Sequence, residues 1–178
     1  MGAFKTLTGQ STSVALDAGF VSALKSLKVT PSPYGTATVS TAGVASFPIT
    51  GGNATIYKKG AVTPYVQGTI DHNGSGLNLT AGSTKVTIDD FVVHPGNNSS
   101  LTGNVLVNGK QAAANAPLFV LDGSTLKTPT LSGGVATLTG TRVLLSSTAA
   151  GLLNKTFGVT AIKPNLLIGV ATIKATGK

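Results

Sequence analysis

Hydrophobic and polar residues alternate along most of the chain in short runs bounded by turn-forming residues. Segments such as "TPYVQGTIDH", "STKVTIDDFVVHPG" and "GVATLTGTRVLLSS" place β-branched residues between Gly, Asn, Asp or Pro. A period of two with such boundaries predicts β-strands. The pair Asn108-Gly109 in "VLVNGKQA" predicts a hairpin with a type I′ turn, because both central residues of that turn need a positive φ.

Two stretches change to a helical period. In "LDAGFVSALKSLKVTP", Asp17 is placed as an N-cap and the apolar residues after it recur at helical spacing. In "SSTAAGLLNKTFGVT", Ser146 or Ser147 caps the predicted helix and Gly158 stands where a C-terminal glycine is expected. Each helix would cover one apolar face of the strands.

The two helical stretches belong to an internal repeat. "TLTG" precedes each helix, and a proline and then "GTATV" or "GVATI" follow it. Chance similarity in Thr- and Gly-rich sequence is the alternative. The repeat predicts strand–helix–strand units at about 4–40 and 135–175 that bracket a β meander at about 43–130, all within one domain, 1–178. We therefore expect a mainly β fold, a β-sandwich or open barrel of short antiparallel strands with two short α-helices and pseudo-symmetric ends.

Composition supports the β prediction and limits the partners. Hydrophobic residues make up 41% of the chain but charged residues only 10%, and Glu is absent. The net charge is +8, yet the lysines are scattered and Arg142 is the sole arginine. Base readout favours arginine, and single-strand grooves use aromatic platforms among basic residues. We therefore expect no specific nucleic-acid binding, and at most loose attraction to a polyanion such as an anionic cell wall.

The same composition bears on location. The chain has no cysteine, and no apolar run approaches the roughly 20 residues that cross a bilayer. "MGAFKTLTGQ" lacks the basic head and apolar core of a signal peptide. The Thr/Ser/Gly-rich composition favours an extracellular or cell-surface protein in which Met1-Gly2 replaces a removed signal. An intracellular or viral structural subunit is the alternative.

Catalytic and metal-binding patterns are missing. There is no nucleophile elbow, P-loop, dinucleotide fingerprint or zincin motif. On one strand, Asp90 and His94 would stand about 13 Å apart, too far to share an ion. Asp122, in "LDGST", is typical of a turn. We therefore predict no catalytic residue, no metal site and no enzyme.

His72 is the candidate binding residue. Alternation places His72 with Val66 and Ile70, at the rim of an apolar face where the strand is expected to end. Asp71 would point to the other side. His72 is then either a polar residue hydrogen-bonded to turn backbone or a ligand for a metal or haem.

The stretch "FPITGG…VQGTIDHNGSGLNLTAGSTKVTIDDFVV" resembles exported domains of the HtaA type, found in haem-uptake proteins of Gram-positive bacteria, or related exported β-rich bacterial proteins. "VATLTGTRVLLSSTAAGLLNKTFG" is similar to the segment that closes such domains. The resemblance implies haem as cofactor and matches His72 to the family's histidine near the haem. The family's axial tyrosine lies near the N-terminal helix, where "GFVSALKSLKV" has none, so Tyr34 or Tyr65 would have to be the partner.

Two further hypotheses about function stand beside the intracellular one. The first is a non-catalytic exported or cell-surface module without a cofactor, whose partner is a cell-surface protein or itself, as a homo-oligomer or a polymer assembled through sheet edges. The second is a carrier of haem or a small ligand that uses His72, with Tyr34 or Tyr65.

Overall fold

The computed structural model describes residues 1–178 and is dominated by antiparallel strands, with two helices. Helix α1 spans Ala18–Ser26 and helix α2 spans Ser147–Phe157, and a short 3-10 helix, η1, spans Gly123–Thr125. The strands are β1 (Gly2–Phe4), β2 (Leu7–Leu16), β3 (Thr30–Gly35), β4 (Thr38–Val39), β5 (Val44–Pro48), β6 (Gly51–Ile56), β7 (Val66–Ala81), β8 (Thr84–His94), β9 (Ser100–Val107), β10 (Lys110–Asp122), β11 (Thr130–Ser132), β12 (Val135–Leu145) and β13 (Leu167–Gly177).

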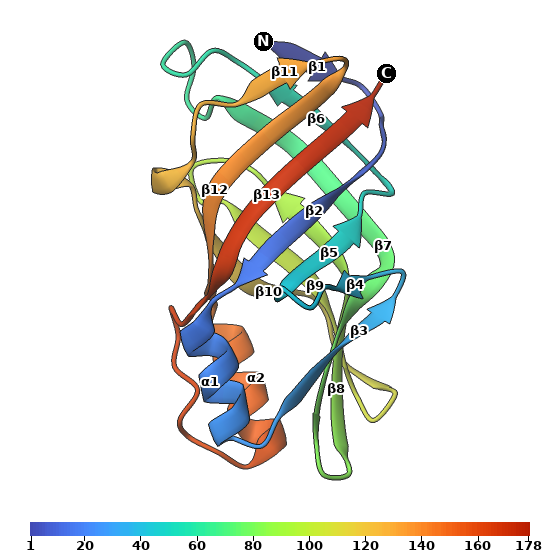
Figure 1. Ribbon diagram of the computed structural model, residues 1–178, viewed down its shortest axis with the longest axis vertical. Helices are drawn as coiled ribbons and strands as arrows, with labels where there is room; N and C mark the ends of the chain where they lie inside the picture. Colours follow the sequence, from blue (N-terminus) through green and yellow to red (C-terminus); the bar gives the residue numbers. More distant parts are fainter.

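All the strands belong to one curled sheet (Figure 1). Its order is β1-β6-β7-β8-β9-β10-β12-β13-β2-β5-β4, with β3 added to β7 and β11 to β12. Strand β5 pairs with β2 and the chain then passes into β6, which pairs with β7. The sheet therefore curls round until β5 contacts β7. The predicted mainly β fold is confirmed, in its open-barrel form and not as a sandwich of two sheets.

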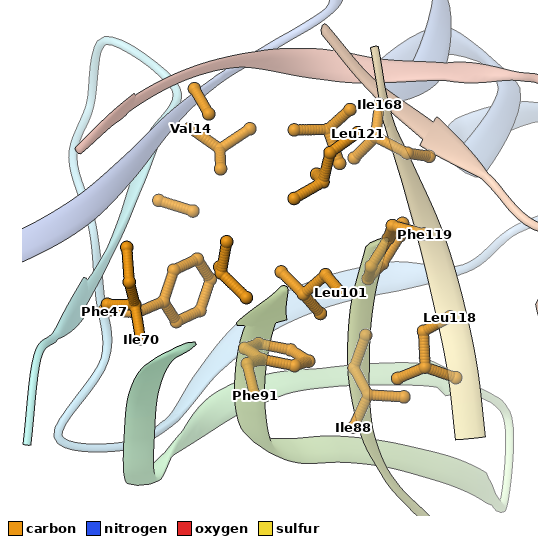
Figure 2. Packing of buried hydrophobic residues seen from close by; sticks show 14 of the residues in the cluster. Val14, Phe47, Ile70, Ile88, Phe91, Leu101, Leu118, Phe119, Leu121 and Ile168 are labelled. Atoms are coloured by element: carbon orange, nitrogen blue, oxygen red, sulfur yellow. The ribbon is translucent and has the colours of Figure 1, made fainter. Parts of the chain in front are cut away.

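The core fills the inside of the curl. A single cluster of 35 buried hydrophobic residues runs through it. Figure 2 shows how Phe47, Phe91 and Phe119 meet there from three strands. The ring centroids of Phe47 and Phe91 are 5.2 Å apart and those of Phe91 and Phe119 are 6.4 Å apart, both edge to face. Such pairs add to the stability gained from burial alone.

The two ends of the chain share the predicted strand–helix–strand order. Strand β2 leads into α1, β12 leads into α2, and both strands pair with β13. The later segments are not equivalent, because "GTATV" is divided between β3 and β4 whereas "GVATI" lies inside β13. The chain ends lie together: Thr6 and Lys178 exchange two backbone hydrogen bonds, of 3.1 and 2.9 Å. Figure 1 shows both termini at the end of the curl opposite α1 and α2.

Local turn chemistry follows the sequence at the β9–β10 hairpin. Asn108 and Gly109 have φ values of 49° and 80°, as a type I′ turn requires. The hairpin prediction is confirmed.

Neither helix has the length and apolar character needed to span a membrane.

Candidate ligand-binding site

Capped helices fix the end of the curl where the candidate site lies. The carboxylate of Asp17 accepts the backbone N–H groups of Gly19 (2.8 Å) and Phe20 (3.2 Å) at the start of α1. Ser146 accepts the N–H of Ala149 at 3.0 Å and starts α2, which ends at Gly158 with a left-handed φ of 66°. These are the predicted caps, and the first of the two serines is the one used. Ser146 also donates its hydroxyl to the carbonyl of Pro117 on β10, which holds α2 to the sheet.

A cavity of about 290 Å³ lies between the two helices and the inner face of the sheet. This is near the lower limit, about 300 Å³, of the usual range for small-molecule pockets. Of its 22 lining residues 19 are hydrophobic, and they come from both helices, six strands and the segment after α2. They are Phe20, Ala23, Leu24, Leu27, Leu77, Leu79, Val86, Ile88, Val105, Leu118, Phe119, Leu145, Ala149, Leu152, Leu153, Ala161, Ile162, Leu166 and Ile168.

The polar part of this helix cavity is small. It consists of Ser26 at the end of α1, Thr156 in the last turn of α2, and Lys163 beyond α2. None of the lining residues is acidic, and none is a histidine, tyrosine or methionine. The helix cavity can therefore hold an apolar body by contact and burial, and it offers no side chain that ligates a transition metal in the usual way.

His72 lies in the interior next to this cavity. Strand β7 does not end at His72 but continues to Ala81, with a bulge between His72 and Gly76. The side chain is 1% exposed, so the predicted position at a rim is wrong. Its Nδ1 lies 3.1 Å from the carbonyl oxygen of Phe91, and its Nε2 lies 2.8 Å from Oγ1 of Thr12.

The two contacts determine the tautomer of His72. A carbonyl oxygen only accepts, so Nδ1 carries the proton and donates it to Phe91. Nε2 then has the lone pair and accepts the hydroxyl of Thr12. Burial lowers the pKa of His72 from 6.5 to about 4, against the opposing effects of the Phe91 carbonyl and Asp71. His72 is therefore neutral at physiological pH, with both ring nitrogens in hydrogen bonds.

A space of about 40 Å³ surrounds the His72 ring, lined by Thr12, Phe47, Phe91 and other core residues. Leu77, Phe119 and Ile168 separate it from the helix cavity, since they line both. The histidine thus forms part of the inner wall behind the helix cavity and does not point into it.

The tyrosines that sequence reasoning paired with His72 lie elsewhere. Tyr34 is on β3 opposite Gly76, is 39% exposed and lines none of the cavities. Tyr65 lines a third, larger hollow of about 810 Å³ together with the polar loop at 95–100 and part of η1. His72 does not line that hollow. The structure therefore does not bring His72, Tyr34 and Tyr65 to one place.

The remaining ionisable candidates are dispersed. The structure contains no group of three or more His, Cys, Asp or Glu side chains placed to hold a metal ion. His94 bonds Thr102 through Nε2 at 3.0 Å. Hydrogen bonds from Ser124, with Arg142 at 3.4 Å, lower the pKa of Asp122.

Asp89 is the one buried acid. Its Oδ1 has no hydrogen-bond partner, and burial and the neighbouring Asp90 raise its pKa. Strict alternation along β8 would place Asp89 on the same face as Phe91. A bulge at Asp90, where φ is 50°, instead leaves Ile88 and Phe91 on the inner face and turns Asp89 outward.

Sequence reasoning missed the helix cavity itself. Its residues are the ordinary Leu, Ile, Val and Ala of strands and helices, so no motif marks them. The apolar stripes of the two helices were the available signal, because each stripe had to face something.

Comparison with solved structures identifies molecules with the same architecture. The C-terminal domain of HtaA from Corynebacterium glutamicum superposes with a TM-score of 0.66 over 98% of this chain and 99% of that one, at 14% identity. The chain shares the HtaA fold. The resemblance predicted from the sequence is therefore confirmed at the level of fold.

Two further structures have the same architecture. The haem-binding protein HtaB of the same organism gives a TM-score of 0.55 at 12% identity, with 97% of this chain and 95% of that chain covered. A domain-swapped dimer of a histidine-to-alanine variant of the HtaA C-terminal domain gives a TM-score of 0.56 at 13% identity, with 90% of this chain and 92% of that chain covered. Comparison of the sequence with protein-family models and with curated proteins gives no match.

Proposed function

We propose that this chain is a non-catalytic binding protein that holds a small apolar ligand in the helix cavity. The observation that carries the proposal is a hollow of about 290 Å³ with 19 hydrophobic residues among its 22 lining residues. Protein interiors are normally packed without voids of this size. A module with a purely structural task has no need of one, so ligand binding accounts for the cavity better than a structural role alone.

Haem is the first ligand to consider, because HtaB, which has the same fold, is a haem-binding protein. The lining of the helix cavity does not fit a haem whose iron is held by a side chain. The helix cavity contains no histidine, tyrosine, cysteine or methionine. The lone pair of His72 Nε2 is already engaged by Thr12 at 2.8 Å. To ligate iron, His72 would have to give up that bond and reach past Leu77, Phe119 and Ile168.

Export and display at the cell surface remain part of the proposal. They rest on the low charged fraction, 10%, and the abundance of neutral polar residues. A binding domain in that location would meet ligands outside the cell.

The proposal is tested by blocking the helix cavity. Ala23 lines it from α1, so Ala23→Phe fills it, whereas Ser22→Phe places the same ring on the exposed side of the helix. We expect the neutral dye Nile red to brighten with the wild type and with Ser22→Phe, and to stay dim with Ala23→Phe. Circular dichroism checks that all three proteins fold. Equal brightening of the three would refute the assignment of the cavity.

Haem is tested in the same preparation. We expect any change in the Soret band on addition of ferric haem to be the same for the wild type and for His72→Ala. A shifted band that disappears in His72→Ala would instead support haem ligation by His72.

A further inference from the structure

The helix cavity has one charged group in its lining, and this group is positive. Lys163 lies in the segment between α2 and β13, and its Nζ donates to the carbonyl of Thr160 at 3.0 Å. Lys163 is exposed to solvent where it lines the cavity. Lys163 has no carboxylate partner, because the chain's single salt bridge joins Arg142 and Asp122. The ammonium is therefore free to pair with an anion from outside the chain.

The surroundings of this end of the molecule are also positive. Lys25 lies in the last turn of α1 and Lys155 in the last turn of α2. Lys85 follows the turn of the β7–β8 hairpin, which Figure 1 places at the same end as the tips of the helices. No acidic residue lines the helix cavity. The lysines also offset the partial negative charge of the two helix C-termini, which would otherwise disfavour an anion there.

The chemical character of the lining residues indicates what kind of ligand body the helix cavity would hold. Apart from Phe20 and Phe119, the hydrophobic lining is aliphatic. The polar residues Ser26, Thr156 and Lys163 come from the C-terminal end of α1, the C-terminal end of α2 and the segment beyond α2. An apolar cavity with its polar groups from neighbouring segments matches a molecule with an apolar body and one polar head.

Resting on the proposed function, we infer that the ligand is a fatty acid, with its alkyl chain in the helix cavity and its carboxylate at Lys163. The chain is held by burial, which is roughly proportional to the apolar area removed from water. The carboxylate accepts a charge-assisted hydrogen bond from the ammonium, which is stronger than a bond between neutral groups. No iron or other metal takes part.

Isothermal titration of the full chain with decanoic acid and with decanol, which have the same chain length and different heads, tests this inference. We expect decanoate to bind about tenfold more tightly than decanol to the wild type at pH 7, because only the carboxylate pairs with Lys163. Lys163→Met should abolish the preference and Lys163→Arg should keep it. Lys5→Met, which removes an exposed lysine beside Thr6 at the paired chain ends and outside the lining, is the matched control and should also keep it.

The outcomes separate the ligand class from the proposed function. Equal binding of decanoate and decanol, unaffected by Lys163→Met but abolished by Ala23→Phe, would overturn the fatty-acid inference and leave apolar ligand binding intact. Binding of metal-free protoporphyrin without binding of decanoate would overturn it in favour of a planar ligand. If neither the alkyl ligands nor Nile red binds, the proposed function itself fails.

Discussion

A neutral imidazole bound at both nitrogens joins three strands of this protein. His72 on β7 donates to Phe91 on β8 and accepts from Thr12 on β2. Strands β7 and β8 are neighbours in the sheet, but β2 and β7 are not, since β8, β9, β10, β12 and β13 lie between them in its order. The bond from Thr12 to His72 therefore crosses the inside of the curl and ties its two sides together.

The buried state of His72 predicts how stability depends on pH. Because the folded pKa of about 4 lies below the ordinary 6.5, the unfolded chain binds more protons between these values. Lowering the pH from 7 to 4 should therefore cost up to roughly 3 kcal/mol of unfolding free energy through this residue. Urea unfolding at several pH values measures this loss of unfolding free energy. His72→Gln should make the pH dependence shallower, whereas the matched change His94→Gln should leave it steep.

At the scale of the elements, the cap of α2 determines the position of one wall of the helix cavity. Ser146 begins α2 with its accepted bond from Ala149 and fastens it to β10 with its donated bond to Pro117. Both bonds are largely shielded from water, because Ser146 is buried. The position of the α2 wall of the cavity thus depends on one hydroxyl.

Ser146→Ala should lower the free energy of unfolding by about 1–2 kcal/mol, since it removes a cap and the hydrogen bond that joins α2 to the Pro117 carbonyl on β10. Ser147→Ala changes the exposed neighbour that was the alternative cap in the sequence, and it should have little effect. Chemical denaturation of the two variants gives the comparison. Equal losses would contradict the assignment of the cap to Ser146.

The sequence predicts features that depend on neighbouring residues better than contacts between residues far apart in the chain. Both helices, their caps and the Asn108-Gly109 hairpin depend on residues a few positions apart, and these predictions are confirmed. The surroundings of His72 depend on Thr12, which is 60 positions away, and on Phe91 across a bulge. Alternation along one strand cannot describe either contact, which is why His72 was expected at a rim.

At the scale of the whole molecule, the edges of the sheet limit how copies could associate. The strands at its two ends are β1, with three residues, and β4, with two, while β3, which is added to β7, has six residues of which two are prolines without an N–H donor. Edge strands this short offer few free hydrogen-bonding groups to a neighbouring sheet. Association by exchange of a segment is a different route, and a histidine-to-alanine variant of the HtaA C-terminal domain takes it.

The bond across the curl predicts which variants would exchange segments. Thr12→Val and His72→Ala remove the link between β2 and β7, so refolding at high protein concentration should give a larger dimer fraction than for the wild type. His94→Ala is the control, since His94 bonds Thr102 on the neighbouring strand β9. Size-exclusion chromatography with light scattering measures the fraction. Dimer fractions that are the same for all four proteins would refute a role for this bond.

The paired chain ends determine how the domain could be tethered. Thr6 and Lys178 are bonded to each other, and both termini lie at the end of the molecule away from α1 and α2. A linker, an anchor or a second domain attached at either terminus would emerge there. The helix cavity would then lie at the end of the protein away from whatever surface displays it.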